Sequence, residues 1–479
     1  MRVRPTMLPH KLLRTGLRAI AVCAVAGMWL GTPQTARAET LADALASAYN
    51  HSGLLEQNRA LLRAADEDVA IAVAALRPII NWSADITRSF GRTNTQQGAV
   101  GIRQTDVNLG ISASLLLYDF GRTEFQIDAA KETVLATRDA LVSVEQQVLL
   151  RAVRAYMNVR RNGRFVSLRE NNLRLIRQEL RAAKDRFEVG EVTRTDVALA
   201  EARLAAARSG LALAQGDLLQ SIEEFRAAVG RKPGTLKAPR RAPNLSGNVD
   251  AAKSIAVRKH PDMLKAQRDI AAAELNMNAA AAAKKPTVNL VGRLGAGEEV
   301  YGDDFNRTGS VGVQITGPIY QGGALTATKR KAQAQRDGLR ARLHIVRHQV
   351  MQDVGNAYAQ LRASRAGVAA SQQEVRAARV AFRGVREEAK LGARTTLDVL
   401  DAEQDLLDAE ANLISAEADV LIASYAVLAS IGELTAKDLR LNVQTYDPEA
   451  YYNLVKDAPI EGSKQGKQLD RVLKALGKE

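Results

Sequence analysis

Apolar and polar residues alternate strictly along two segments in each half of the chain. In the first half the apolar positions are Ile80, Trp82, Ala84 and Ile86, then Val107, Leu109, Ile111, Ala113, Leu115 and Leu117. In the second half they are Val288, Leu290 and Leu294, then Val311, Val313 and Ile315. A period of two predicts β-strands with one apolar and one polar face. The polar segments between them, 91–106 and 296–310, are predicted to be hairpin loops.

A seven-residue repeat follows Gly190 and recurs after Gly392. Its first copy consists of Val197, Leu204, Leu211, Leu218 and Phe225, with Ala200, Ala207, Ala214 and Ser221 at the second position of the repeat. Its second copy consists of Val399, Leu406, Leu413, Val420 and Val427, with Ala402, Ala409, Ala416 and Ala423. This pattern predicts a coiled coil. The preceding segment 122–188 lacks proline and would span about 100 Å as one helix. We therefore predict antiparallel helical hairpins with tips at the two glycines.

The two halves of the chain match each other at a nearly constant offset. Pro78 and Pro286 are 208 residues apart, whereas Tyr156 and Tyr358 are 202 apart. One length difference of six residues within the strand region accounts for the change. The sequence thus predicts a tandem duplication, with a first repeat over 39–247 and a second over 248–440. The extension 441–479 has no counterpart, and its Lys-rich end predicts partial disorder.

The first 38 residues have the pattern of a secretory signal peptide. They contain six basic residues and no acidic one, an apolar stretch over 19–31, and Ala36-Arg37-Ala38 before Glu39. Cleavage before Glu39 is therefore expected. It lowers the net charge from +14 to +8 and removes Cys23, the only cysteine. After Glu39 we find no run of the roughly 20 apolar residues that a membrane-spanning helix needs, so strands would have to cross any membrane.

Composition argues against a compact enzyme, because only 4% of the residues are aromatic. We find no nucleophile–base arrangement and no phosphate-binding loop, and we predict no catalytic residue and no cofactor. His344 and His348 are four residues apart but have no third ligand nearby in the sequence, so we predict no metal site. The basic residues spread through the predicted helices lack interleaved aromatics, which argues against nucleic acid, whereas juxtamembrane arginines are expected to meet anionic lipid groups.

The predicted elements constitute an α+β membrane protein, in which antiparallel coiled coils join four amphipathic strands. Four strands cannot close a barrel, and open strand edges are not tolerated in lipid. Three copies would supply twelve strands, enough for a water-filled transmembrane β-barrel. An exported protein of this shape is interpreted as a duct from the outer membrane into the periplasm. The alternative is an exported periplasmic coiled-coil adaptor or scaffold without a pore.

Over residues 41–440 the chain resembles the TolC-type outer-membrane efflux and secretion ducts. The resemblance rests on the duplication, on the strand-to-helix corners 117–121 and 317–323, and on the tips 189–198 and 391–402. It implies a homotrimer in the outer membrane of a Gram-negative cell, with an α-helical barrel that tapers to a periplasmic aperture. It also implies docking to a periplasmic adaptor of an inner-membrane pump, of ABC or RND type, and the export of drugs or secreted proteins without chemistry.

The residues themselves leave two interpretations of the tips open. Gly190 and Gly392 permit the positive φ of a tight turn. Thr195, Asp196, Thr396 and Asp398 are expected where the returning helices begin, as caps and as partners of the helix dipole. Asp398 and Asp401 share a helix face, extended by Asp405 and Asp408, which predicts either carboxylate rings in a trimer or a solvated flank.

The resemblance assigns roles to several of these residues. It implies that Asp398 and Asp401 line the aperture and that Arg394 latches it to a neighbouring tip at Thr195 and Asp196. A tyrosine latch of some members is replaced by Ala389. The residues implied in adaptor docking are Gly190, Val192, Thr193, Gly392, Thr395 and Leu397.

Overall fold

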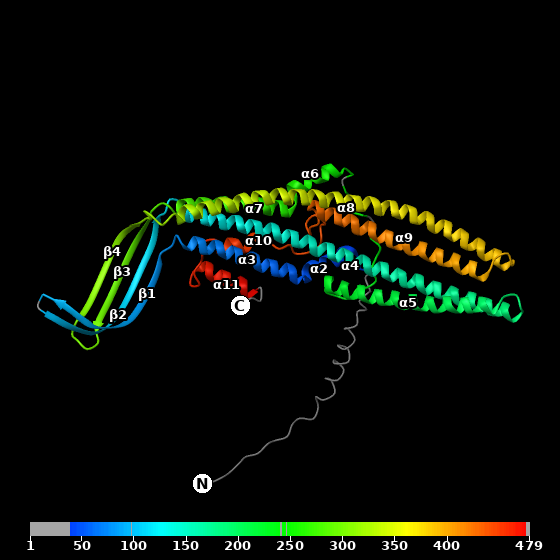
Figure 1. Ribbon diagram of the computed structural model, residues 1–479, viewed down its shortest axis with the longest axis horizontal. Helices are drawn as coiled ribbons and strands as arrows, with labels where there is room; N and C mark the ends of the chain where they lie inside the picture. Colours follow the sequence, from blue (N-terminus) through cyan, green and yellow to red (C-terminus); the bar gives the residue numbers. More distant parts are fainter. Residues whose placement is uncertain (1–38, 97, 240–241, 246, 476–479) are drawn as a thin grey trace, which may run out of the picture.

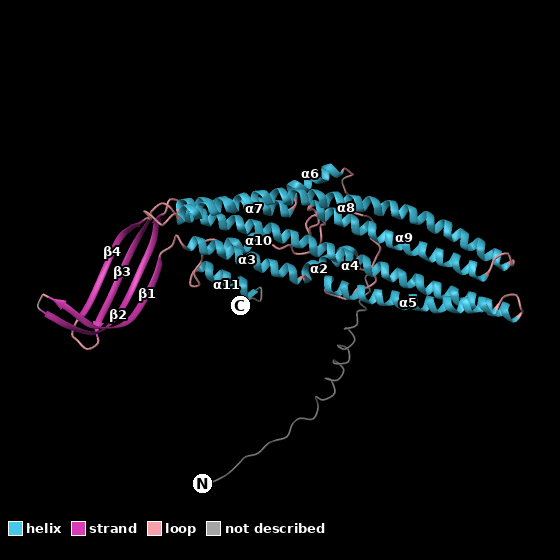
Figure 2. Ribbon diagram, in the orientation of Figure 1, coloured by secondary structure: helices cyan, strands magenta, loops and turns pink. Residues whose placement is uncertain are grey.

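The computed structural model describes residues 39–96, 98–239, 242–245 and 247–475, which form an elongated molecule. A four-stranded sheet lies at one end and two helical hairpin tips lie at the other, with further helices around the middle (Figures 1 and 2). The predicted signal peptide, 1–38, lies outside the described residues.

Two long helical hairpins form most of the length. The first consists of α4 (Arg122–Glu188) and α5 (Arg194–Val229), the second of α8 (Ala324–Lys390) and α9 (Thr396–Ile431). Helices α4 and α8 have 67 residues each, about 100 Å at 1.5 Å per residue. The predicted alanine seam of α5 is buried, as are Phe225 near the end of α5 and Val427 at the equivalent position of α9. The returning helices therefore pack as the seven-residue repeat indicates.

Helix α9 has a second buried row that the sequence interpretation missed. It lies one residue after the predicted seam and consists of Leu400, Leu407, Ile414 and Leu428. Leu400 packs with Leu173 and Ala200 of the first hairpin. Helix α9 thus lies between α8 on one side and the first hairpin on the other.

Helix α9 also corrects one prediction from the sequence. We expected no segment after Glu39 to be apolar enough for a membrane-spanning helix, but α9 is long and apolar enough by composition to span a membrane. Its packing within the helical region accounts for that composition.

Four shorter helices recur in the two halves. They are α2 (Leu41–His51) and α3 (Gly53–Ala74), then α6 (Val249–Lys259) and α7 (Pro261–Ala282). Each begins at a side-chain cap, for example Thr40 and Asn248. The two pairs start 208 residues apart, whereas the hairpins start 202 apart, the same offsets that the sequence shows.

The two main cores lie at mid-length, where these helices meet the hairpins. Tyr156, fully buried, lies in the first, and Tyr358 lies in the second. The Tyr156 hydroxyl lies 2.7 Å from the carbonyl oxygen of Lys237 in the linker between the halves. Aromatic residues therefore fill the cores where several helices converge, whereas alanines fill the seams of the hairpins.

The sheet is an antiparallel meander in the order β1-β2-β3-β4. Its strands are β1 (Ile79–Thr95), β2 (Gly98–Tyr118), β3 (Thr287–Glu299) and β4 (Phe305–Thr316). The strands are longer than predicted, since the ladder continues to Thr95↔Gly98 and to Glu298↔Phe305. The predicted loops 91–106 and 296–310 are therefore wrong in extent. Polar residues there continue the backbone ladder, which hydrogen-bonds independently of side-chain polarity.

Opposite faces of the sheet differ in chemistry. One face carries Ile80, Trp82 and Ile86 of β1, with Val311, Val313 and Ile315 of β4, all exposed in the single chain. The other face carries polar residues such as Asn81, Ser112 and Arg293, which lie in one cross-strand row. Strands β1 and β4 are the sheet edges. We call the apolar side the outward face and the polar side the inward face.

A buried aspartate fixes the corner between β2 and α4. The Asp119 carboxylate accepts hydrogen bonds from the backbone N–H of Thr123 at 2.8 Å and from its hydroxyl at 2.6 Å. Gly121 has φ +80 and precedes α4 directly. This corner joins the strand to the first turn of the helix, so the sheet and the hairpins are tied together at their junction.

The C-terminal extension contains two short helices, and its partial disorder stays a prediction. Residues 441–475 contain α10 (Pro448–Val455) and α11 (Lys464–Ala475), and the last four residues lie outside the described chain. The Tyr451 hydroxyl donates to Glu67 of α3 at 2.6 Å. Tyr446 and Tyr452 pack on the apolar cluster of α3 and α4. The extension is therefore held against the body of the protein by its tyrosines.

Candidate functional site

The two hairpin tips are built in the same way. Helix α4 is followed by Gly190 at φ +81, and helix α8 by Gly392 at φ +75. Backbone N–H groups one residue beyond each glycine donate back into the helix, from Glu191 to Arg186 and from Ala393 to Glu388, at 2.9 Å in both cases. This is the glycine-terminated stop in which the left-handed residue lets the chain reverse direction. The tip glycines were predicted correctly.

Capping boxes start both returning helices, and they correct the predicted caps. Thr193 is the N-cap of α5 and Thr395 is the N-cap of α9. The carboxylate of Asp398 accepts from the Thr395 backbone N–H at 2.9 Å and from its hydroxyl at 2.8 Å. The predicted caps Thr195 and Thr396 lie inside the first helical turn instead. The reciprocal bonds of a capping box, not the mere presence of threonine, decide which one caps.

The same geometry holds Asp196 and Asp398 ionised. Asp196 accepts two hydrogen bonds from Thr193, both at 2.8 Å. The backbone hydrogen bond to Thr193 or Thr395, followed by the hydroxyl bond, lowers the pKa of each carboxyl below its usual range. Both tips therefore present a fixed negative charge at the start of a helix, where the helix dipole favours it.

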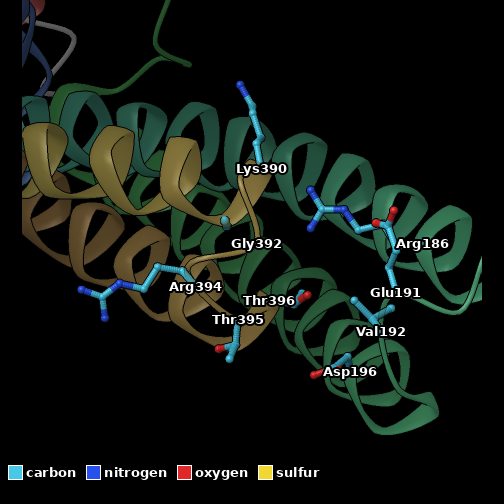
Figure 3. A pocket seen from close by; sticks show the side chains of 10 residues that line it. Arg186, Glu191, Val192, Asp196, Lys390, Gly392, Arg394, Thr395 and Thr396 are labelled. Carbon is cyan, nitrogen blue, oxygen red and sulfur yellow. The ribbon is translucent and has the colours of Figure 1, made fainter.

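Arg394 and the predicted latch residues are apart within one chain. The Arg394 Nε lies 2.9 Å from Glu388 Oε2, on the same hairpin. That hydrogen bond is the largest cause that raises the pKa of Arg394. Figure 3 shows the Arg394 side chain extending away from Asp196. A contact with Thr195 and Asp196 would therefore have to involve a neighbouring copy or another conformation.

Asp401 has a partner that the sequence did not identify. Its Oδ1 lies 2.5 Å from Nη2 of Arg203, so the ion pair joins α9 to α5. Arg203 stands at the position equivalent to Asp405 in the other repeat, 202 residues away. The sequence did contain a signal for this ion pair, because a basic residue at a position that is acidic in the other repeat indicates a pairing between the two hairpins.

Glu403 is a second cross-hairpin contact that sequence interpretation missed. Only 6% of it is exposed, and it accepts a hydrogen bond from the side-chain amide of Asn172 on α4. Burial raises the pKa of Glu403, although Asn172 and then Arg169 act in the opposite direction. In the sequence Glu403 lies between Asp401 and Asp405, which belong to the acidic face predicted for this helix, so nothing there indicated that Glu403 is buried. Only the packing of α9 on α4 reveals it.

A cleft of about 400 Å³ lies between the two tips (Figure 3). It is lined by Arg186, Glu191, Val192 and Asp196 from the first tip and by Lys390, Arg394 and Thr395 from the second. The residues directly before the tip glycines, Val189 and Leu391, are 71% and 86% exposed. They were missed, although they are equivalent positions in the two repeats. Leu397 is 40% exposed, and Val192 is half-buried.

Ala389, at the position for which the family resemblance implied a tyrosine latch in some members, is buried in the seam of the second hairpin. It packs with Phe382 and Val399. A small residue there lets α8 and α9 approach closely next to the tip. Within the described ranges there is no group of three or more His, Cys, Asp or Glu residues that could hold a metal ion.

Comparisons with known proteins agree with this arrangement. The family profile described as "Outer membrane efflux protein" matches residues 44–231 and 254–433. The chain is 39% identical over 428 residues to the outer membrane efflux protein BepC of Brucella suis, covering 89% of this chain and 92% of that protein. It is 25% identical over 389 residues to the outer membrane protein TolC of Escherichia coli, covering 78% of each.

A solved structure shares the fold. The CmeC outer membrane channel of Campylobacter jejuni matches with a TM-score of 0.73 and 16% identity, over 87% of this chain and 89% of that one. The resemblance inferred from the tips and the duplication is confirmed, as are the fold class and the outer-membrane location. The family is one of channels, a non-enzymatic kind of protein. The chain belongs to the outer membrane efflux protein family.

Proposed function

We propose that three copies of this chain form one duct through the outer membrane and into the periplasm. The observation that supports this most directly is the sheet. It has an apolar outward face, a polar inward face and two unpaired edge strands, β1 and β4. In lipid both edges must be paired, and pairing β4 of one copy with β1 of the next satisfies them. Three copies give a twelve-stranded barrel around a wet lumen.

The hairpins extend this duct on the periplasmic side. Exposed apolar side chains remain on α5 and α8, including Leu213, Ile345 and Val380, each about 70% exposed in the single chain. Contact between α5 of one copy and α8 of the next would cover them, as edge pairing does in the sheet. The hairpin tips then surround the far end of the duct.

We further propose that the tips dock with a periplasmic adaptor of an inner-membrane pump of ABC or RND type. The cleft between the tips and the exposed Val189 and Leu391 support this, because they offer apolar contacts within a charged rim. The docking residues Gly190, Val192, Thr193, Gly392, Thr395 and Leu397 belong to the two turns around that cleft or adjoin it. The pump would select the cargo, either drugs or secreted proteins.

The aperture gate that we propose consists of Asp398, Asp401, Arg394, Thr195 and Asp196. The ionised carboxylates of Asp196 and Asp398 support a cation-favouring ring when three tips converge. The Arg203–Asp401 pair adds a bond that holds the second hairpin to the first. Opening the aperture by moving the second hairpin outward has to break that pair.

A bilayer experiment tests the proposed duct. The purified protein should migrate as a heat-sensitive trimer from the outer-membrane fraction and should conduct ions in planar bilayers. A soluble periplasmic monomer without conductance would instead support the alternative, a coiled-coil adaptor or scaffold without a pore. The amphipathic sheet disfavours that alternative, because a scaffold has no use for an apolar surface toward lipid.

A further inference from the structure

The outward face of the sheet changes from apolar to basic toward the ends of its hairpins. Near the helices it carries Ile80 and Trp82 of β1, in register with Ala113 and Ile111 of β2. Farther out the same face carries four exposed arginines interleaved with phenylalanines. These residues are Arg88, Phe90 and Arg92 of β1, Arg103 of β2, and Phe305 and Arg307 of β4. We call the four arginines the outward arginine cluster.

Charge is segregated across the thickness of this part of the sheet. The inward face at the same level carries Asp85, Asp106 and Glu299, which follow from the register of the ladder. The outward face there carries one acid, Glu298, opposite Phe305. A sheet that only needed solubility would have mixed charges on both faces. The segregation indicates that the basic outward face meets anionic surroundings and that the acidic inward face meets cationic ones.

The outward arginine cluster has no acidic partner among the residues that the structure describes. Within the described chain, none of its members forms an ion pair, whereas many helical arginines do, such as Arg151 with Glu224 at 2.8 Å and Arg379 with Glu410 at 2.6 Å. Arg307 lies over the ring of Phe305, 5.8 Å from its centroid. These guanidinium groups are therefore available to anions from outside the chain.

The position of the four arginines along their strands indicates which level of the membrane surrounds them. Arginine is costly on the lipid face at the middle of a bilayer and tolerated near the headgroups. Aromatic residues concentrate at the same level. The helices mark the periplasmic side, so the hairpin ends lie in the outer leaflet. A guanidinium binds phosphate through two parallel hydrogen bonds, which makes a phosphorylated headgroup the matching ligand.

We propose that the outward arginine cluster binds the phosphate groups of the glycolipid that forms the outer leaflet of a Gram-negative outer membrane. This inference rests on the proposed trimer, in which the β4 edge of one copy meets the β1 edge of the next. Arg307 of one copy and Arg88 of the next then flank the same seam. The lipid phosphates bridge positive charges contributed by two copies and so stabilise the junction between them.

Binding of purified lipid to the trimer tests the proposal. Bis-phosphorylated lipid A is added to detergent-solubilised trimer, and the bound lipid is quantified by native mass spectrometry. The triple variant Arg88→Gln, Arg92→Gln, Arg103→Gln should bind at least tenfold more weakly, and the corresponding triple Arg→Lys variant should bind with intermediate affinity, because lysine keeps the charge but cannot form the two parallel hydrogen bonds. Arg103→Gln should weaken binding, whereas Arg293→Gln, the same change on the inward face, should leave it within twofold.

Several outcomes would overturn the proposal. These are unchanged binding by the triple glutamine variant, equal loss in Arg293→Gln, or equal affinity for dephosphorylated lipid A or phosphatidylglycerol. Heat-sensitive trimer and bilayer conductance are measured on the same preparations. Conductance without selective lipid binding would reject the lipid site and leave the duct standing, whereas a monomer without conductance would reject the duct itself.

Discussion

Arg203 and Asp401 join the two helical hairpins of one chain through an ion pair of 2.5 Å near the tips. The two residues belong to α5 and α9, which otherwise meet through apolar and alanine side chains. Both side chains are partly exposed, 39% and 55%. The pair is therefore an adjustable contact on a seam that is otherwise held by packing.

Removing this pair should favour an open aperture. An exposed ion pair contributes up to about 1 kcal/mol, so Arg203→Ala is expected to raise the open fraction by up to about fivefold. Single-channel recording in planar bilayers measures it. Lys184→Ala is the matched control, because its 2.8 Å pair with Glu201 lies within the first hairpin. An equal effect of both variants would contradict the role of the cross-hairpin pair.

Replacing Arg394 tests the latch. If Arg394 holds the closed aperture to a neighbouring tip, Arg394→Ala should raise single-channel conductance. Glu388→Ala removes the partner that Arg394 has within its own hairpin and should leave conductance unchanged or lower it, because the arginine is then freed for the latch. A closed-state conductance that Arg394→Ala does not alter would rule the latch out.

The caps should be distinguishable from their neighbouring threonines. Thr395→Ala removes a reciprocal capping box and should destabilise the start of α9 by about 1 kcal/mol. Thr396→Ala, one residue further, should have little effect. Hydrogen exchange of residues 396–402 measures the difference. Faster exchange in Thr396→Ala than in Thr395→Ala would show that the assignment of the cap is wrong.

Asp66 should make stability depend on pH. It is fully buried on α3, and burial raises its pKa to about 6, while Arg138 acts against that shift. A carboxyl with a raised folded pKa stabilises the fold when protonated, so stability falls as the pH rises from about 4 through about 6. The loss amounts to about 3 kcal/mol at neutral pH.

Asp66→Asn should remove this dependence. Its melting temperature at pH 7.5 should exceed that of the unmodified protein, while the two should nearly coincide near pH 3, below both pKa values. Asp68→Asn is the control, since Asp68 is exposed on the same helix. Parallel pH profiles of the unmodified protein and Asp66→Asn would show that the buried carboxyl does not control stability.

Crosslinking should identify the docking partner. A cysteine at Thr193 or Thr395, in a chain whose predicted mature part contains no cysteine, should capture a periplasmic adaptor in living cells. A cysteine at Gln220, exposed on α5 but about 40 Å from the tip, should capture far less. Equal capture at all three positions would contradict docking at the tips.

Features that depend on local periodicity could be predicted from the sequence. The helix 122–188, the alanine seams, the two tip glycines and the change of offset from 208 to 202 all correspond to the structure. Strand ends and the course of residues 441–475 could not, because ladder hydrogen bonds and docking on α3 override side-chain polarity. Val189 and Leu391 were predictable from their equivalence, yet their exposure is visible only in the folded tips.

The amino-acid sequence by itself determined the elements, their duplication and the family, because heptads, strand alternation and glycine turns are properties of short stretches of backbone. Only the tertiary structure decided which charges meet. Arg203 with Asp401 and Asn172 with Glu403 depend on how the helices are rotated and staggered against one another, and Arg394 with Glu388 rather than Asp196 depends on the course of the tip turn. A shift of one residue along α9 moves its side chains by about 100° around the helix, so such pairs are set by the packing of α9 between α4 and α8.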